Sequence, residues 1–91
     1  MLAVEWKAAA RYDLAEICDY IEQRNPMAAA AVHADIVKAV EQLPEHPYLY
    51  RAGRVPGTRE LVVHPNYIVI YRVLTDRIEV LGVLHAAREY P

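Results

Sequence analysis

Apolar residues in the first half of the chain recur at helical spacing in two consecutive segments. The first stripe, within residues 8–24, consists of Ala10, Leu14, Ile17, Cys18 and Ile21. The second stripe, which follows Pro26, consists of Ala29, Val32, Ile36, Val40 and Leu43. Steps of three or four residues place each set on one face of a helix. Because Asn25-Pro26 breaks the first helix and Pro26 suits the first turn of the next, the pattern predicts an antiparallel helical hairpin.

The remaining segments are patterned as strands. Residues 2–6 are expected to form a short first strand, and three further strands are expected at 58–64, 67–74 and 77–84. The connections between these three strands are only two residues long, so the strands should form an antiparallel meander. Residues 44–57 are rich in proline and glycine, and they are expected to form an ordered surface loop.

These elements predict one α+β domain over residues 1–91, in the order strand, helix, helix, strand, strand, strand. The helical hairpin must pack on one face of an antiparallel sheet to bury its two stripes. The inner strand at 67–74 is apolar on both sides. One side carries Tyr67, Val69, Tyr71 and Val73, and the other carries Ile68, Ile70, Arg72 and Leu74. One helical layer covers only one of these sides, so we expect a partner polypeptide to cover the second.

Composition narrows the class of protein. Of the 91 residues, 55% are hydrophobic and 24% are charged, which excludes a disordered or low-complexity protein. Cys18 is the only cysteine, so an internal disulfide and a cysteine-based zinc site are excluded, and a reducing cytosol is the simplest compartment. No apolar run approaches the roughly 18–20 residues of a membrane span, and the first residues lack signal-peptide features. We therefore expect a cytoplasmic protein with no membrane contact.

Charge divides the chain in two. Residues 1–45 carry four basic and eight acidic side chains, a balance of −4, whereas residues 46–91 carry six arginines and four acidic side chains, a balance of +2. The net charge of −2 argues against a general nucleic-acid binder. A basic half that contains only arginine suits contact with anions or with a carboxylate-bearing partner, and scattered surface charge is the alternative interpretation.

Candidate chemistry also lies in the second half. His85 is expected at a strand end near Arg88 and Tyr90, a set with which a small metal-independent nuclease moves a proton and offsets phosphate charge. A hydrogen-bonded structural histidine is the alternative. Arg59 and Glu60 are expected to form an ion pair at a strand edge. No pair of histidines has the spacing of metal ligands and no phosphate-binding glycine loop is present, so neither a metal nor a cofactor is predicted.

Three segments resemble a known family. They are residues 54–61 (RVPGTREL), 64–73 (HPNYIVIYRV) and 83–88 (VLHAAR), and they resemble the RelE/ParE superfamily of bacterial toxins, the toxin halves of type II toxin–antitoxin modules. Residues 46–50 (HPYLY) are similar to the ParE-like branch. The resemblance implies a helical hairpin packed on an antiparallel sheet. It also implies a cognate antitoxin whose C-terminal segment wraps around the toxin.

The superfamily contains two activities. RelE-like members are ribosome-dependent mRNA endonucleases, whereas ParE-like members inhibit DNA gyrase. The RelE-like pattern has an arginine three residues before the tyrosine of the inner strand, and here that position holds Ile68, before Tyr71. Such nucleases also bring lysines to the sheet, but this chain has only Lys7 and Lys38, both in its first half. The resemblance therefore favours the gyrase inhibitor, with the mRNA endonuclease acting on ribosome-bound mRNA as the alternative.

Each hypothesis assigns residues. For gyrase inhibition, the resemblance and the basic half suggest target contacts at Arg51, Arg54, Arg88 and Tyr90. For antitoxin binding they suggest Arg59, Tyr67, Tyr71 and Arg72, although Tyr67 and Tyr71 also suit core packing. The endonuclease hypothesis uses His85 as acid or base, Arg59 or Arg88 on the phosphate, and Tyr90 for stacking. A third hypothesis is a non-toxic member that only binds its antitoxin.

Overall fold

A computed structural model describes residues 2–63 and 66–86 of the chain. The predicted α+β class, the first strand and the helical hairpin are all confirmed. The elements in chain order are β1 (Ala3–Trp6), α1 (Ala8–Glu22), α2 (Pro26–Glu41), the 3-10 turn η1 (Leu43–Glu45), β2 (Arg51–Ala52), β3 (Arg59–Val63), β4 (Tyr67–Val73) and β5 (Arg77–His85). The two-residue strand β2 lies inside the segment that the sequence predicted to be a loop, so four strands follow the helices.

The strands form one five-stranded sheet in the order β1-β5-β4-β3-β2. Strands β2 to β5 pair antiparallel with their neighbours in sequence, as the predicted meander requires. Strand β1 completes the other edge and pairs with β5 in parallel. The sheet is therefore mixed rather than purely antiparallel, because the chain leaves β1 through the whole helical hairpin before it enters the meander.

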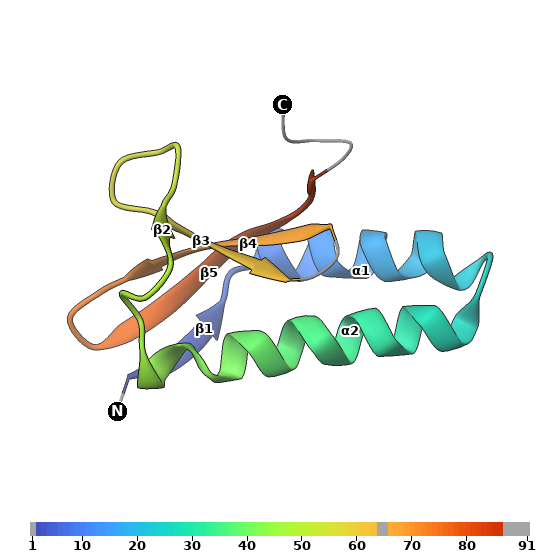
Figure 1. The fold of residues 1–91 in the computed structure, drawn as a ribbon, viewed down its shortest axis with the longest axis horizontal. Helices are drawn as coiled ribbons and strands as arrows, with labels where there is room; N and C mark the ends of the chain where they lie inside the picture. The colour runs from blue at the N-terminus through green and yellow to red at the C-terminus, as the bar shows by residue number, and fades with distance from the viewer. Residues whose placement is uncertain (1, 64–65, 87–91) are drawn as a thin grey trace.

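The local sequence explains where α2 begins. Asn25 has extended backbone geometry, and its Oδ1 accepts a hydrogen bond from the backbone N–H of Ala28 at 3.1 Å, which caps α2. Pro26 occupies the first turn, where no N–H is needed. The two helices lie side by side and antiparallel (Figure 1), so the loop around Asn25 is the tip of the hairpin.

Both helical stripes pack on one face of the sheet, which we call the covered face. Its core comprises buried side chains from both layers. They include Ala10, Leu14 and Ile17 of α1, Ile36 and Val40 of α2, and Leu61, Val69, Tyr71, Ile78, Val80 and Val83 of the sheet. The opposite side of the sheet, which we call the open face, carries no helix in the described part of the chain. The open face nevertheless contains buried side chains, since Glu60, Ile68 and Glu79 are only 2–3% exposed.

One polar residue joins the helices to the sheet. The antiparallel register between β4 and β5 shifts near Ile70 and Tyr71, which marks a β-bulge. Next to this irregularity, the backbone N–H of Val83 donates to Asp13 Oδ2 of α1 at 3.0 Å. A Cβ atom on Gly82 would lie 3.2 Å from the same oxygen, so the absence of a side chain at Gly82 lets the carboxylate approach. Asp13 thereby fixes α1 against β5.

Candidate functional site

The open face is organised around one buried carboxylate. Glu79 of β5 is only 2% exposed, although it lies on the side of the sheet without helices. Arg72 of β4 donates to Glu79 Oε1 at 2.7 Å, and Arg77 donates to Glu79 Oε2 at 3.1 Å. Lys7 Nζ lies 3.8 Å from Oε2. Three cations therefore surround one anion.

This arrangement sets the protonation state of Glu79. The hydrogen bond from Arg72 is the main cause that holds the pKa of Glu79 below its ordinary value, while burial acts in the opposite direction and Arg77 lowers the pKa further. Arg77 also bonds Glu5 and Asp76. Glu79 is therefore ionised at neutral pH.

The predicted ion pair between Arg59 and Glu60 is wrong. Successive residues of a strand point to opposite faces, and these two follow that rule. Glu60 is 3% exposed and bonds Arg51 Nε at 2.8 Å on the open face. Arg59 turns the other way, and its Nη1 donates to the carbonyls of Tyr48 and Tyr50 at 3.2 and 2.9 Å. Arg59 thus fastens the segment before β2 to the sheet.

Tyr67 and Tyr71 lie in the core on the covered face, at 7% and 0% exposure. The Tyr71 hydroxyl donates to the carbonyl of Pro47 at 2.8 Å, and burial raises the pKa of this phenol, so it remains a donor at neutral pH. Their burial removes both tyrosines from any surface that an antitoxin reaches in this conformation. Of the residues expected to bind an antitoxin, Arg59 and Arg72 are the two that remain partly exposed.

Arg59 and His85, the two candidate nuclease residues that the structure describes, are not brought together. His85 ends β5, and its ring lies edge-on to Tyr67 with centroids 5.3 Å apart. Its Nδ1 is buried and has no hydrogen-bond partner among the residues that the structure describes. Arg59 pairs with Tyr71 and His85 pairs with Tyr67, which places them about 13 Å apart along β4, at roughly 3.3 Å per residue. Arg88 and Tyr90 lie outside the described residues.

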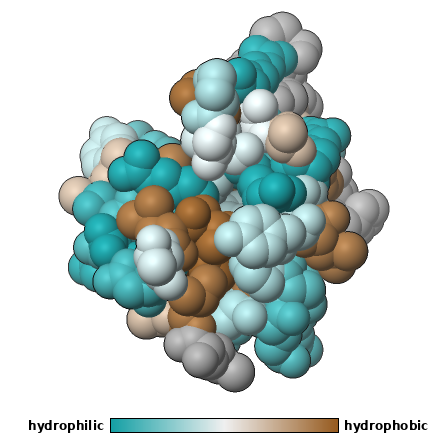
Figure 2. All heavy atoms as spheres, turned by 90° about the vertical axis from the view of Figure 1, so that its left-hand side faces the viewer, coloured by the Kyte–Doolittle hydropathy of each residue, from teal (hydrophilic) through white to brown (hydrophobic). Residues whose placement is uncertain are grey.

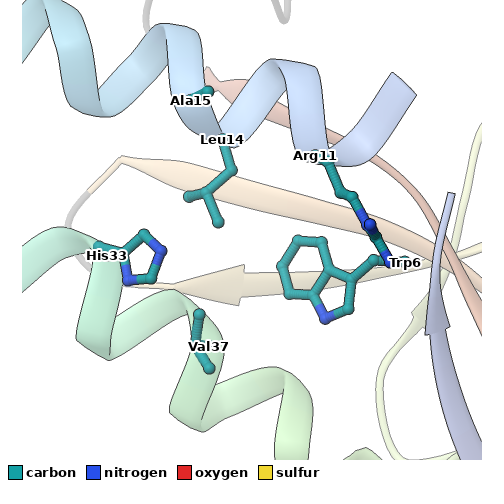
Figure 3. A pocket seen from close by; sticks show the side chains of 6 residues that line it. All are labelled: Trp6, Arg11, Leu14, Ala15, His33 and Val37. Atoms are coloured by element: carbon teal, nitrogen blue, oxygen red, sulfur yellow. The ribbon is translucent and has the colours of Figure 1, made fainter. Parts of the chain in front are cut away.

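A groove runs between the two helices near β1. Its volume is about 420 Å³, and its lining is mostly apolar, formed by Trp6, Arg11, Leu14, Ala15, His33 and Val37. Figure 3 shows the Trp6 ring and the Leu14 and Val37 side chains facing the space between the helices, with Arg11 and His33 at opposite sides. The groove therefore offers an apolar floor with cationic or neutral polar groups at its rim. No pattern in the sequence indicates this groove, because Trp6 and the helices meet only in the folded chain.

A second surface surrounds the β2–β3 loop, residues 53–58. The loop extends from the sheet at the end of the molecule that also carries the β4–β5 turn (Figure 1). Tyr48, Leu49 and Val55 are each about two-thirds exposed. A hollow of about 260 Å³ lies beside them, lined by Tyr48, Ala52, Gly57, Thr58, Arg59 and Val73. Figure 2 faces this end of the molecule, where hydrophobic and hydrophilic residues both reach the surface.

Metal and membrane chemistry find no support in the described residues. Within residues 2–63 and 66–86, no group of three or more His, Cys, Asp or Glu side chains is placed to hold a metal ion. Neither helix in that part of the chain has the length and apolar character to cross a membrane.

Comparisons with known proteins relate this chain to a family of bacterial toxins. Residues 4–90 match the family model described as the ParE toxin of the type II toxin–antitoxin system parDE. The Y4kP protein of Sinorhizobium fredii is 44% identical over 89 residues, which cover 97% of this chain and 92% of that protein. Toxin RelE2 of Caulobacter vibrioides is 37% identical over 90 residues, which cover 97% of this chain and 99% of that protein.

Solved structures share the fold. A chain of the chromosomal ParDE toxin–antitoxin system from P. aeruginosa superposes with a TM-score of 0.84 and 26% identity, over 93% of this chain and 96% of that chain. A chain of the toxin–antitoxin complex RelBE2 from Mycobacterium tuberculosis superposes with a TM-score of 0.62 and 23% identity, over 92% and 96% of the two chains. The second likeness concerns the fold alone.

Proposed function

Because the chain belongs to the ParE toxin family of type II toxin–antitoxin systems, we propose that it arrests growth by binding DNA gyrase in the cytoplasm and that a cognate antitoxin neutralises it. The match over residues 4–90 carries this proposal. Two observations on the sheet support it. Ile68 stands where RelE-like nucleases have an arginine, and the guanidinium of Arg59 is held by backbone carbonyls instead of facing His85. Inhibition through protein contact requires no assembled catalytic set.

For the target contact we propose Arg51 and Arg54 of the β2–β3 region, together with Arg88 and Tyr90 of the C-terminal segment. The decisive measurement is pulse labelling after the toxin alone is induced, with thymidine and methionine incorporation compared over the first minutes. An early fall in DNA synthesis, followed by gyrase inhibition with the purified protein, is expected. An early fall in methionine incorporation would refute the gyrase target, and unaffected growth would identify a member that only binds its antitoxin.

For the antitoxin we propose an amphipathic, acidic segment that is partly disordered when unbound. Its apolar anchors would enter the groove floored by Trp6 and Leu14, and its carboxylates would meet Arg11 at the rim or Arg59 and Arg72 on the sheet. The solved relative from P. aeruginosa belongs to a ParDE toxin–antitoxin system. Binding of a segment to the folded toxin alone raises the toxin's melting temperature by linkage.

Filling the groove tests this assignment. Ala15 lines the groove on α1, whereas Ala9 is an exposed alanine of the same helix outside its lining. Ala15→Phe should weaken antitoxin co-purification and reduce the rise in melting temperature, and the matched control Ala9→Phe should leave both unchanged. Equal antitoxin binding by the two variants would show that the antitoxin uses another surface.

The second candidate function is a ribosome-dependent mRNA endonuclease. It is favoured by the unpartnered Nδ1 of His85 and by the 37% identity to a protein named toxin RelE2. In that case His85→Ala should abolish toxicity while antitoxin binding persists. His33→Ala, which changes an exposed histidine on α2, is the control. Full toxicity of His85→Ala would eliminate the endonuclease.

A further inference from the structure

The region around the β2–β3 loop exposes an unusual concentration of large hydrophobic side chains. Seven large hydrophobic residues are strongly exposed among the described residues, and three of them lie between positions 48 and 55. Tyr48 is 65% exposed, Leu49 is 67% exposed and Val55 is 64% exposed. Arg51 and Arg54 lie in the same stretch and are also exposed. We call these five residues the loop patch.

The loop that exposes these side chains is closed by hydrogen bonds. The backbone N–H of Gly53 donates to Thr58 O at 2.8 Å, and the Thr58 side chain donates to Val55 O at 2.6 Å. Gly57 has a φ of +88°, a conformation that suits glycine, and it closes the turn. A side chain at Gly53 would collide with Thr58, whose Oγ1 would lie only 2.2 Å from the added Cβ. The loop is therefore closed by hydrogen bonds within it.

The segment before β2 is fixed as firmly. Arg59 donates to the carbonyls of Tyr48 and Tyr50, and its guanidinium lies 5.0 Å from the centre of the Tyr48 ring. The Tyr71 hydroxyl holds the carbonyl of Pro47 from within the core. Side chains held in place before binding lose less conformational entropy when a partner arrives. The loop patch is thus preorganised to make contact.

A hollow also lies beside the loop patch. The hollow of about 260 Å³ lies between Tyr48 on one side and Gly57 and Thr58 on the other, with Arg59 in its lining. Tyrosine and arginine are enriched at the energetic centres of protein–protein interfaces.

We infer that the loop patch and its hollow form the surface by which this toxin binds its protein target, and this inference rests on the proposed function. The occupant is a folded protein surface that presents one apolar side chain next to a carboxylate. The carboxylate is indicated by Arg51 and Arg54, which are exposed in the loop patch. Glu60 is turned toward Arg51 and is buried.

A nucleic acid fits the patch less well. Leu49 and Val55 have no ring on which a base can stack. The chain as a whole has a net charge of −2, which opposes approach to a phosphate backbone. The same patch also lies apart from the helical groove, since the residues that line the two hollows do not overlap.

Matched variants test the inference. Tyr48→Ser and Val55→Glu change the patch, and Tyr12→Ser removes an equally exposed tyrosine from α1. All four proteins, wild type included, are assayed for growth arrest at equal soluble expression, for inhibition of purified gyrase and for antitoxin co-purification. We expect both patch variants to require at least about tenfold more toxin for half-maximal gyrase inhibition, as for a residue at an energetic centre, while antitoxin co-purification is retained. Tyr12→Ser should match the wild type.

Other outcomes overturn the inference in distinguishable ways. Unchanged gyrase inhibition by both patch variants would show that the target binds elsewhere. Loss of antitoxin binding with toxicity retained would assign the patch to the antitoxin. If the wild-type protein itself leaves gyrase active and stops translation, the proposed function fails first, and loss of that translational arrest in the patch variants would identify ribosomal RNA as the occupant.

Discussion

The two faces of the sheet are stabilised by different interactions. On the covered face, Val69 and Tyr71 of β4 are fully buried beneath the two helices and neighbouring strands. On the open face, Arg72 of the same strand covers Glu79, and Arg51 covers Glu60 at the edge. The covered face is held by shape and apolar area, whereas the open face is held by buried carboxylates whose arginines remain about half exposed.

Because the two faces are stabilised differently, substitutions on them should affect different properties, namely stability on one face and binding on the other. Apolar packing contributes most of the free energy of folding, so substitutions on the covered face should act mainly on stability. Exposed arginines contribute little to stability, since water and salt screen their interactions, but they remain available to a partner. Substitutions on the open face should therefore act mainly on binding. The following variants test that division, beginning with the largest expected change.

Tyr71→Ala should produce the largest loss of stability. The side chain is 0% exposed, and truncation of a large buried aromatic residue costs about 3–5 kcal/mol. Tyr71→Phe keeps the ring but removes the donor to the Pro47 carbonyl, so it should cost only about 1 kcal/mol. Urea denaturation followed by circular dichroism measures both. Equal losses for the two variants would show that the hydroxyl, and not the ring, holds this side of the core.

Asp13→Ala should come next, because it detaches α1 from β5. The backbone N–H of Val83 would lose its partner in a partly buried position, which costs about 1–3 kcal/mol. Asp13→Asn retains an acceptor oxygen and should recover most of the loss. Glu16→Ala, an exposed position on the same helix, is the control. If Asp13→Ala unfolds at the same urea concentration as the wild type, the helix is not fastened by this bond.

The fold was largely predictable because its signals are local. Two apolar stripes broken at Asn25-Pro26 give the hairpin, and short turns give the meander. The pairing of β1 with β5 was not predictable in the same way, since it joins segments that lie more than 70 positions apart in the sequence. Strand β2 was missed because two residues, Arg51 and Ala52, are too short a segment to show alternation.

The site was less predictable, although two signals were present. Asp13 falls between Ala10 and Leu14 on the apolar stripe of α1, and a carboxylate in such a position requires a partner. Arg59 and Glu60 are neighbours in a strand, so their side chains point to opposite faces and cannot pair across it. The burial of Glu79 was not visible, because it depends on Lys7, Arg72 and Arg77 converging from three segments. Hollows and grooves likewise exist only once distant segments meet.

Acid should weaken the open face more than the covered face. The pKa of Glu79 in the folded protein lies below its ordinary value of 4.5, so its ionisation stabilises the fold above that pH. This contribution is lost as the pH falls through the lowered pKa. Glu79→Gln removes it at every pH, so the melting temperatures of wild type and variant should differ at pH 7 and approach each other as the pH falls below 4.5. If the difference in melting temperature between the two proteins stayed constant as the pH falls, the ionisation of Glu79 would not account for the loss of stability in acid.

The smallest predicted change in stability is that of Val62→Thr in β3, and the same substitution at the adjacent Val63 is its control. Val62 is 51% exposed on the open face, whereas Val63 is 8% exposed on the covered face. Threonine has the same shape and strand preference as valine and replaces one methyl group by a hydroxyl. Val62→Thr should change the free energy of unfolding by less than about 0.5 kcal/mol, because the hydroxyl stays hydrated. Val63→Thr should cost about 1–3 kcal/mol, because the hydroxyl is buried. Urea denaturation of the pair measures the difference between the faces with shape held constant, and equal losses would mean that the open face is also covered in solution.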